Sequence, residues 1–156
     1  MRKARIAVAA LIGAVGAFVG VQAAFAGENG SDEATMCVFT TQLRAENEVP
    51  FSNSEATGVS QIKVRNDGTI EFMTHILNEG GETFFAGHIH IAPEGVAGPV
   101  VQSLFQGGPT SDEQIMQSGE VSNPALGAAI CSNPTAYYVN YHTTEHPAGA
   151  LRGQLG

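Results

Sequence analysis

Apolar and polar residues alternate along much of the chain beyond residue 35, in short runs that end at glycine, proline or asparagine. Alternation with a period of two is typical of a β-strand that buries one face. Residues 69–77 show it most clearly, because Ile70 and Phe72 share one face while Glu71 and His75 share the other. On this basis strands are predicted over residues 36–43, 56–65, 69–77, 83–92, 99–105, 136–143 and 149–155.

Turn and helix signals separate these strands. The tripeptide Asn-Asp-Gly at 66–68 predicts a hairpin, because glycine readily takes the left-handed conformation that a tight turn requires;. Asn123 and Pro124 suit a helix cap and a first helical position, so a brief helix is expected to run through Cys131;. Residues 106–118 are predicted to be a polar excursion with one short helical turn. The whole pattern predicts an all-β fold, an antiparallel β-sandwich or barrel of about seven or eight strands with one short helix.

The first 26 residues have the three parts of a secretory signal peptide. Three basic residues fall within the first five positions, residues 6–21 are apolar or small, and Ala-Phe-Ala ends at Ala26;. The alternative is a transmembrane anchor, which needs roughly 20 apolar residues and is weakened by the glycines in this run. We therefore predict a signal peptide over residues 1–26, a flexible leader over 27–35 and a β domain over 36–156.

The net charge and the distribution of apolar residues limit which partners and which compartment are expected. The 156-residue chain has a formal net charge of −8, and three of its seven Lys and Arg residues lie in the predicted signal peptide. Because phosphate contacts need clustered cations, nucleic acid is not expected as a partner. No segment after the signal peptide is long and apolar enough to span a membrane, so we expect a secreted product, either periplasmic or extracellular;.

Two cysteines, Cys37 and Cys131, lie in the part of the chain predicted to be exported. An even number of cysteines in an oxidising compartment favours a disulfide. A bond across so long a loop would stabilise the fold by on the order of 4–5 kcal/mol in the chain-entropy description. The alternative is a pair of buried free thiols, and neither cysteine has a neighbour at the spacing of a metal-binding motif.

The histidines are the candidate residues for a functional site. His88 and His90 are two positions apart in a predicted strand, so they project from the same face;. The other face of that strand is predicted to turn toward the core, with Phe85, Ile89 and Ile91. In the predicted strand over residues 136–143, His142 shares a face with Tyr138 and Asn140.

If these two strands are neighbours, His88, His90 and His142 present three imidazoles to one ion. Imidazole ligands suit copper or zinc, and three protein ligands leave a position open for water or a small ligand. His75 and His146 are further candidate ligands, and Glu94 or Glu145 is a candidate for orienting a ligand;.

The alternative interpretation is structural, because paired histidines can be satisfied by hydrogen bonds to Asn140, Tyr138 or backbone carbonyl groups. Known catalytic patterns do not help to choose between the two. The chain contains no nucleophile elbow, phosphate-binding loop or dinucleotide fingerprint, and no close pair of carboxylates typical of a glycosidase;.

Six short motifs occur along the chain in a fixed order: LRAENEVP at 43–50, ATG at 56–58, GHIH at 87–90, GPVV at 98–101, YVNYHT at 138–143 and PAGALRGQL at 147–155. Together they resemble the CHRD domain, a module named from chordin and widespread in bacterial secreted proteins, over residues 37–156. The resemblance implies an extracellular all-β domain in which His88, His90 and His142 are characteristic positions. Family members often carry an acidic residue where this chain has Ala150.

These features predict a secreted CHRD-type binding protein whose histidines bind a metal ion or a small ligand. A metalloenzyme in the style of copper/zinc superoxide dismutase ranks second, because that enzyme needs an aspartate ligand and a bridging histidine for which this chain has no matching pattern. A purely structural extracellular domain is the third interpretation. We also predict that Arg152 pairs with Glu48 at one end of the barrel.

Overall fold

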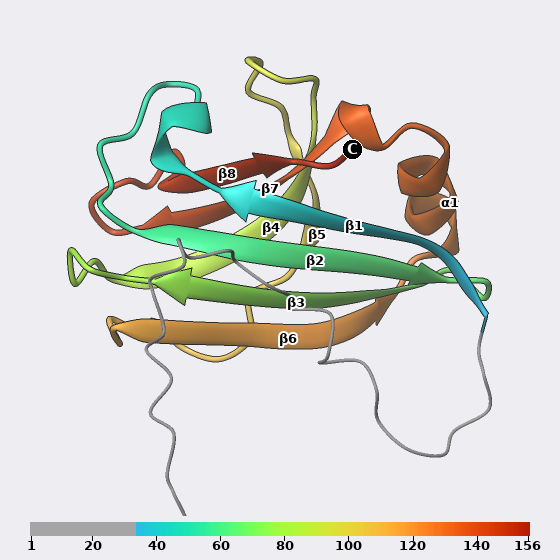
Figure 1. The fold of residues 1–156 in the computed structure, drawn as a ribbon, viewed down its shortest axis with the longest axis horizontal. Helices are drawn as coiled ribbons and strands as arrows, with labels where there is room; N and C mark the ends of the chain where they lie inside the picture. The colour runs from blue at the N-terminus through green and yellow to red at the C-terminus, as the bar shows by residue number, and fades with distance from the viewer. Residues whose placement is uncertain (1–33) are drawn as a thin grey trace, which may run out of the picture. The chain divides into compact units, whose positions relative to one another are not determined.

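The predicted alternation appears as two antiparallel sheets in a computed structural model that describes residues 34–156. One sheet has the strand order β1-β2-β3-β6 and the other has the order β5-β4-β7-β8. Figure 1 shows the first sheet in front of the second, so the domain is a β-sandwich. The strands are β1 (Thr35–Leu43), β2 (Thr57–Arg65), β3 (Thr69–Leu77), β4 (Phe84–Ile91), β5 (Val100–Ser103), β6 (Gln114–Ser122), β7 (Tyr137–Thr143) and β8 (Leu151–Gln154).

The helical elements are short. An α-helix, α1, covers Pro124–Ser132, and 3-10 turns cover Ala45–Asn47 and Pro134–Ala136. The predicted helix start is confirmed, because the side chain of Asn123 accepts a hydrogen bond from the backbone N–H of Leu126 at 3.3 Å;. The signal peptide predicted over residues 1–26, and all but the last two residues of the leader predicted over 27–35, lie outside the described residues.

The core lies between the facing sides of the two sheets. The first sheet contributes Ile70 and Phe72, and the second contributes Ile89 and Tyr141, none of them more than 2 % exposed. Gly87 allows the tyrosine ring to lie close against β4, because a Cβ atom there would stand 2.4 Å from Cε1 of Tyr141. The faces that point away from the core are therefore the two surfaces left for function.

The disulfide between Cys37 and Cys131 is confirmed, with a Cα–Cα distance of 5.8 Å. It joins β1 to α1 across 94 positions of sequence. The helix is thereby tied to the first strand of the sandwich.

The polar excursion predicted over residues 106–118 was wrong for residues 114–118, because Gln114–Ser122 forms strand β6 at the edge of the first sheet, and the loop over 106–113 contains no helical turn. The inward face of β6 carries a buried glutamine, Gln117, whose Oε1 accepts a hydrogen bond from the backbone N–H of Gln106 at 2.7 Å. The two buried positions of β6 are Ile115 and the polar Gln117. Strands are normally predicted from apolar residues that alternate with polar ones, and this alternation is interrupted at Gln117.

The core-facing positions predicted for β4 were also wrong in two of three cases. Ile89 is fully buried, whereas Phe85 and Ile91 are each 39 % exposed. The pairing of β4 with β7 shifts between Phe84 and Ala86, so the strand is irregular at Phe85 and the simple alternation of faces is broken there;.

Candidate metal centre

The outer face of the second sheet brings three histidines together. His88 and His90 lie on β4, and His142 lies on β7, the strand beside it. The antiparallel pairing places Asn140 opposite His88 and Ala86 opposite His142, so all three imidazoles start from the same patch of sheet. We call these three residues the histidine cluster.

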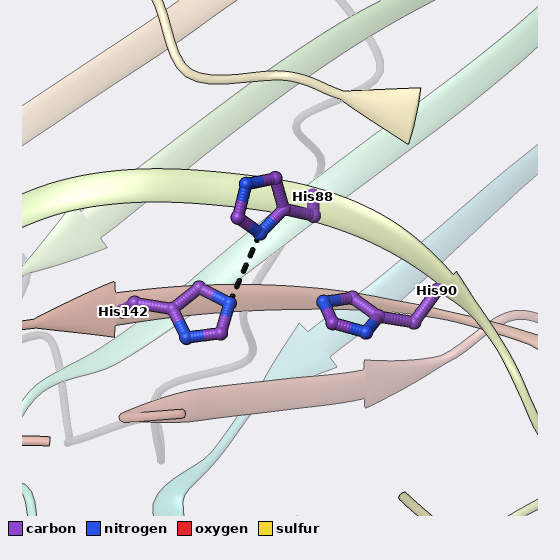
Figure 2. A group of neighbouring side chains, drawn as sticks. All are labelled: His88, His90 and His142. Carbon is purple, nitrogen blue, oxygen red and sulfur yellow. Dashed lines mark hydrogen bonds between the residues drawn. The ribbon is translucent and has the colours of Figure 1, made fainter. Parts of the chain in front are cut away.

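Figure 2 shows the three rings turned toward one another. One ligand atom from each ring lies within 4.8 Å of the corresponding atoms of the other two. Nδ1 of His88 is 3.1 Å from Nε2 of His142, and the ring centroid of His90 lies 5.6 Å and 5.8 Å from those two rings. Nitrogen atoms at these separations can all reach a single ion after small side-chain rotations.

Two backbone carbonyl groups determine which ring nitrogen carries the proton. Nδ1 of His90 lies 2.9 Å from the carbonyl oxygen of Gly98, and Nδ1 of His142 lies 3.1 Å from that of Pro147. A carbonyl oxygen only accepts, so each Nδ1 is the donor and each Nε2 carries a lone pair. The lone pair of His142 faces Nδ1 of His88. Within the described residues, Nε2 of His90 is buried and has no hydrogen-bond partner.

All three imidazoles are held in the neutral form. The pKa of His142 is lowered to about 4, mainly by burial and also by the neighbouring His88, while the hydrogen bond to Pro147 opposes the shift. Burial is also the main cause of the lowered pKa values of His88 and His90. Neutral imidazole is the form that binds metal ions, so at neutral pH no proton has to be displaced from the Nε2 atoms.

The loop over residues 92–99, which joins β4 to β5, carries the carbonyl group of Gly98, and we call it the covering loop. The guanidinium group of Arg152 is 1 % exposed and donates hydrogen bonds to the carbonyl oxygens of Val96 and Pro93, each at 2.9 Å. Its carbon atom Cζ stands 3.6 Å from the ring centroid of Tyr138, whose hydroxyl group accepts from the N–H of Gly98 at 3.0 Å. The loop that contacts the histidine cluster is therefore anchored from the sheet beneath it.

The pair predicted between Arg152 and Glu48 is not formed. Both carboxylate oxygens of Glu48 accept from Nδ2 of Asn140 at 2.9 Å, and the remaining donor contact of Arg152 goes to Oε1 of Gln154. Glu48 is 5 % exposed, and burial raises its pKa to about 7, against the smaller opposing effects of Asn140 and Arg152. The arginine influences this carboxylate through its charge and does not bind it.

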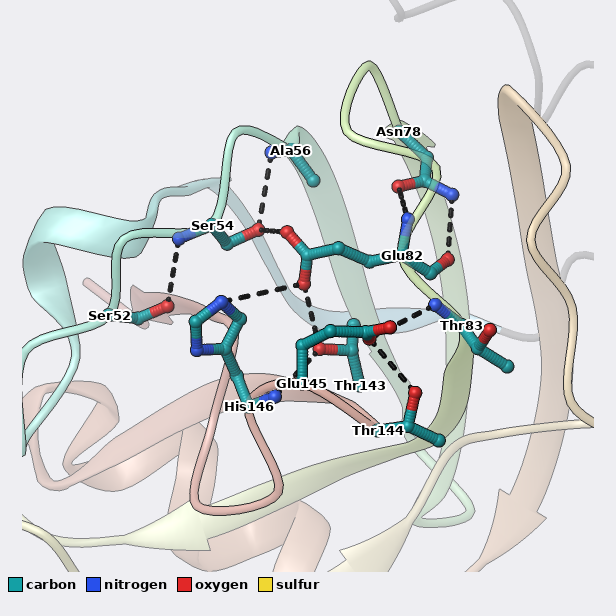
Figure 3. A network of polar contacts seen from close by, with 10 residues as sticks. All are labelled: Ser52, Ser54, Ala56, Asn78, Glu82, Thr83, Thr143, Thr144, Glu145 and His146. Atoms are coloured by element: carbon teal, nitrogen blue, oxygen red, sulfur yellow. Dashed lines mark hydrogen bonds and ion pairs between the residues drawn. The ribbon is translucent and has the colours of Figure 1, made fainter.

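The structure does not bring His75 or His146 to the histidine cluster. His75 lies on β3, in the other sheet. His146 lies between β7 and β8, where its Nε2 is 3.8 Å from Oε2 of Glu82. That carboxylate also accepts hydrogen bonds from the hydroxyl groups of Ser54 and Thr143, at 2.5 Å and 2.7 Å, and Figure 3 shows the network.

The two glutamates predicted to orient a metal ligand have other surroundings. Oε2 of Glu145 accepts from the backbone N–H of Thr83 and from the hydroxyl group of Thr144, as Figure 3 shows. Glu94 lines an open pocket together with Arg44. In the described part of the chain, neither glutamate forms a hydrogen bond to a histidine of the cluster.

The sequence indicated backbone carbonyl groups as hydrogen-bond partners of the histidines, but not which carbonyl groups orient the cluster. The carbonyl groups of Gly98 and Pro147 are backbone atoms and leave no mark in the identity of those residues. The roles of Tyr138 and Arg152 depend on the loop folding back over the sheet. Their only sequence signal is that both fall within the ordered motifs noted above.

A family model described as the CHRD domain matches residues 39–155. The chain belongs to the CHRD domain family. The match includes the histidine cluster and seven of the eight strands in full, so the cluster is part of the CHRD domain. No curated protein and no solved structure matches the chain.

The domain family and the disulfide both bear on the compartment. CHRD domains are of an extracellular type, and the disulfide of this CHRD domain is consistent with secretion. Among the described residues, none of the helices has the length and apolar character needed to cross a membrane.

Proposed function

We propose that this CHRD domain is a secreted, metal-binding protein without enzymatic activity, exported after removal of residues 1–26. His88, His90 and His142 are the proposed ligands, and the proposed ion is copper or zinc. Imidazole is a good ligand for both ions, so the donor set alone does not choose between them.

The observation that carries the proposal is the buried Nε2 of His90, which has no hydrogen-bond partner in the described chain although it faces two more imidazoles. Leaving a buried polar atom unpaired costs about 1–3 kcal/mol. A metal ion would satisfy this atom together with the nitrogen atoms of His88 and His142. In metal sites the second ring nitrogen of a ligating histidine commonly donates to a carbonyl group, as it does for His90 and His142 here;.

The residues around the histidine cluster would hold its rings in position for metal binding. Gly98 and Pro147 fix two rings with their Nε2 lone pairs directed into the cluster, and Arg152 holds the loop that carries Gly98. A bound copper or zinc ion would supply an open coordination position for water or a small ligand.

Elemental analysis and metal titration test this proposal. Protein purified without added metal should contain one equivalent of metal, and stripped protein should bind one equivalent of zinc or of Cu(II) at the histidine cluster. His88→Ala and His142→Ala should each weaken binding at least about tenfold, because the loss of a ligand exceeds the usual effect of losing an outer partner. The matched control is His146→Ala, which removes a histidine that lies outside the cluster and should leave the affinity unchanged.

Substoichiometric metal, together with equal weak binding by wild type and both cluster variants, would contradict the proposal and favour the structural interpretation. Tight binding combined with turnover of superoxide or peroxide by the loaded protein would favour the metalloenzyme instead.

A further inference from the structure

The methionines in the described part of the chain do not belong to its core. The described residues contain Met36, Met73 and Met116, of which Met36 is 48 % and Met116 is 61 % exposed while Met73 is half-buried. Methionine is normally among the residue types most often buried completely. All three alternate with core residues of the first sheet and so lie on its outer face. Packing therefore does not explain their positions.

Two of these methionines stand beside a histidine. His75 on β3 is directly opposite Met116 on β6, and Met73 precedes His75 by two residues on the same face. Cβ atoms of directly opposed residues lie about 4.5–5.5 Å apart, and neighbours on one face of a strand are about 6.5–7 Å apart. A methionine side chain has three rotatable bonds, so both thioether sulfur atoms can reach a point above the imidazole. Figure 1 shows β3 and β6 side by side at the lower edge of the front sheet.

The surroundings of this group are neutral. In the pairing with β2, Gln61 faces Met73 and Val59 faces His75, and on β6 Ser118 faces Met73. The nearest carboxylate on the same face of β3 is Glu71. It is already paired with Lys63 at 3.1 Å and with Arg65 at 2.7 Å. Soft sulfur donors and one imidazole, without a free carboxylate, make a poor site for hard cations.

We propose that Met73, His75 and Met116 form a second metal site, which binds Cu(I). Thioether ligands select Cu(I) over divalent ions, and imidazole binds copper in either oxidation state. This site lies on the opposite sheet from the histidine cluster and goes beyond the function proposed above. The two thioether ligands carry no charge and no dissociable proton, so they bind Cu(I) without any proton release.

An anaerobic titration of the full chain with Cu(I), in competition with the chromophoric chelator bicinchoninate, tests the site. The key variant is Met73→Leu/Met116→Leu, which removes both sulfur atoms and keeps the volume and the apolar character of the side chains. It should bind one equivalent of Cu(I) fewer than wild type. The matched control is Met36→Leu, which changes an exposed methionine at the far end of the same face and should bind Cu(I) as wild type does.

A second measurement keeps the test independent of the histidine cluster. In the His88→Ala/His142→Ala background, copper-edge X-ray absorption should show sulfur neighbours that disappear when the two leucine substitutions are added. His75→Gln should weaken Cu(I) binding at least about tenfold while zinc binding at the cluster is unchanged.

Equal Cu(I) binding by wild type and Met73→Leu/Met116→Leu would overturn the second site, as would a copper spectrum without sulfur neighbours. Failure of the proposed function is distinguishable, because it appears as the absence of zinc binding in wild type. Both leucine positions lie on the outer face, and unchanged circular dichroism and urea midpoints would show that the fold is intact.

Discussion

Replacing Glu48 by glutamine should stabilise the protein at alkaline pH and leave its stability unchanged in acid. Glu48 is 5 % exposed, and the side chain that hydrogen-bonds to its carboxylate is the amide of Asn140, beside the backbone N–H of Val49. Oδ1 of that asparagine is buried without a hydrogen-bond partner among the described residues. A glutamine at position 48 keeps the shape of the side chain, removes the charge and offers an N–H group to this oxygen.

The pKa of Glu48 gives the size and the sign of the effect. Burial raises it from 4.5 to about 7 in the folded protein. Between these two values the folded chain holds a proton that the unfolded chain has released, so the contribution to stability is complete below pH 4.5 and is lost as the pH rises through 7. A difference of this size corresponds to on the order of 3 kcal/mol. Glu48→Gln should therefore raise the free energy of unfolding by about that amount at pH 8, and by close to zero at pH 4.

Urea denaturation of metal-free wild type and Glu48→Gln at pH 4 and pH 8 measures the effect. Comparing the two proteins at each pH cancels the titration of the histidines. The matched control is Glu46→Gln, because the side chain of Glu46 is 64 % exposed and its replacement should change stability by less than about 0.5 kcal/mol at either pH. A difference between wild type and Glu48→Gln that is equal at pH 4 and pH 8, or a loss of stability at pH 8, would refute the reasoning.

Three further substitutions test the disulfide, the covering loop and the core. Cys37→Ser/Cys131→Ser opens a loop of 94 residues and should lower the free energy of unfolding in urea by about 4 kcal/mol. Arg152→Lys cannot keep both hydrogen bonds to the loop carbonyl groups, so zinc titration should show an affinity about 10-fold lower. Gly87→Ala places a Cβ atom 2.4 Å from the ring of Tyr141 and should lower the thermal midpoint by an amount that corresponds to about 2–3 kcal/mol.

Each of these substitutions has a control. Reducing agent should destabilise wild type but have no effect on the cysteine variant. Gln102→Ala changes a residue of the second sheet whose amide donates a hydrogen bond to the backbone of Ser103 at an exposed position. This variant should leave the zinc affinity unchanged, whereas Arg152→Lys should lower it. Gly108→Ala, whose added Cβ atom meets nothing within 4 Å, should keep the wild-type thermal midpoint. Equal effects of substitution and control would contradict the structural argument in each case.

The sequence predicted strands well where one face is uniformly apolar. Residues 69–77 were predicted to the residue, because Ile70, Phe72 and Ile76 alternate with more exposed positions. Strand β6 was missed, because its buried face includes Gln117, whose side chain accepts a hydrogen bond from the backbone of Gln106 in the loop before the strand. A hydrogen bond that allows a polar residue to be buried cannot be predicted from local alternation.

The three histidines of the candidate site could be predicted from the sequence, but the orientation of their rings could not. A period of two places His88 and His90 on one face, and it places His142 on a face of its own strand. The adjacency of β4 and β7, which are separated in sequence by β5 and β6, follows from the topology of the sandwich. The proton positions depend on the carbonyl groups of Gly98 and Pro147, which only the folded loops bring into contact with the rings.

The most direct test of the histidine cluster is X-ray absorption at the zinc edge of protein loaded with one equivalent of zinc. We predict three imidazole nitrogen ligands at about 2.0–2.1 Å from the ion, with one of them lost in His90→Ala. A coordination shell of oxygen atoms, unchanged by His90→Ala, would contradict a metal centre at His88, His90 and His142.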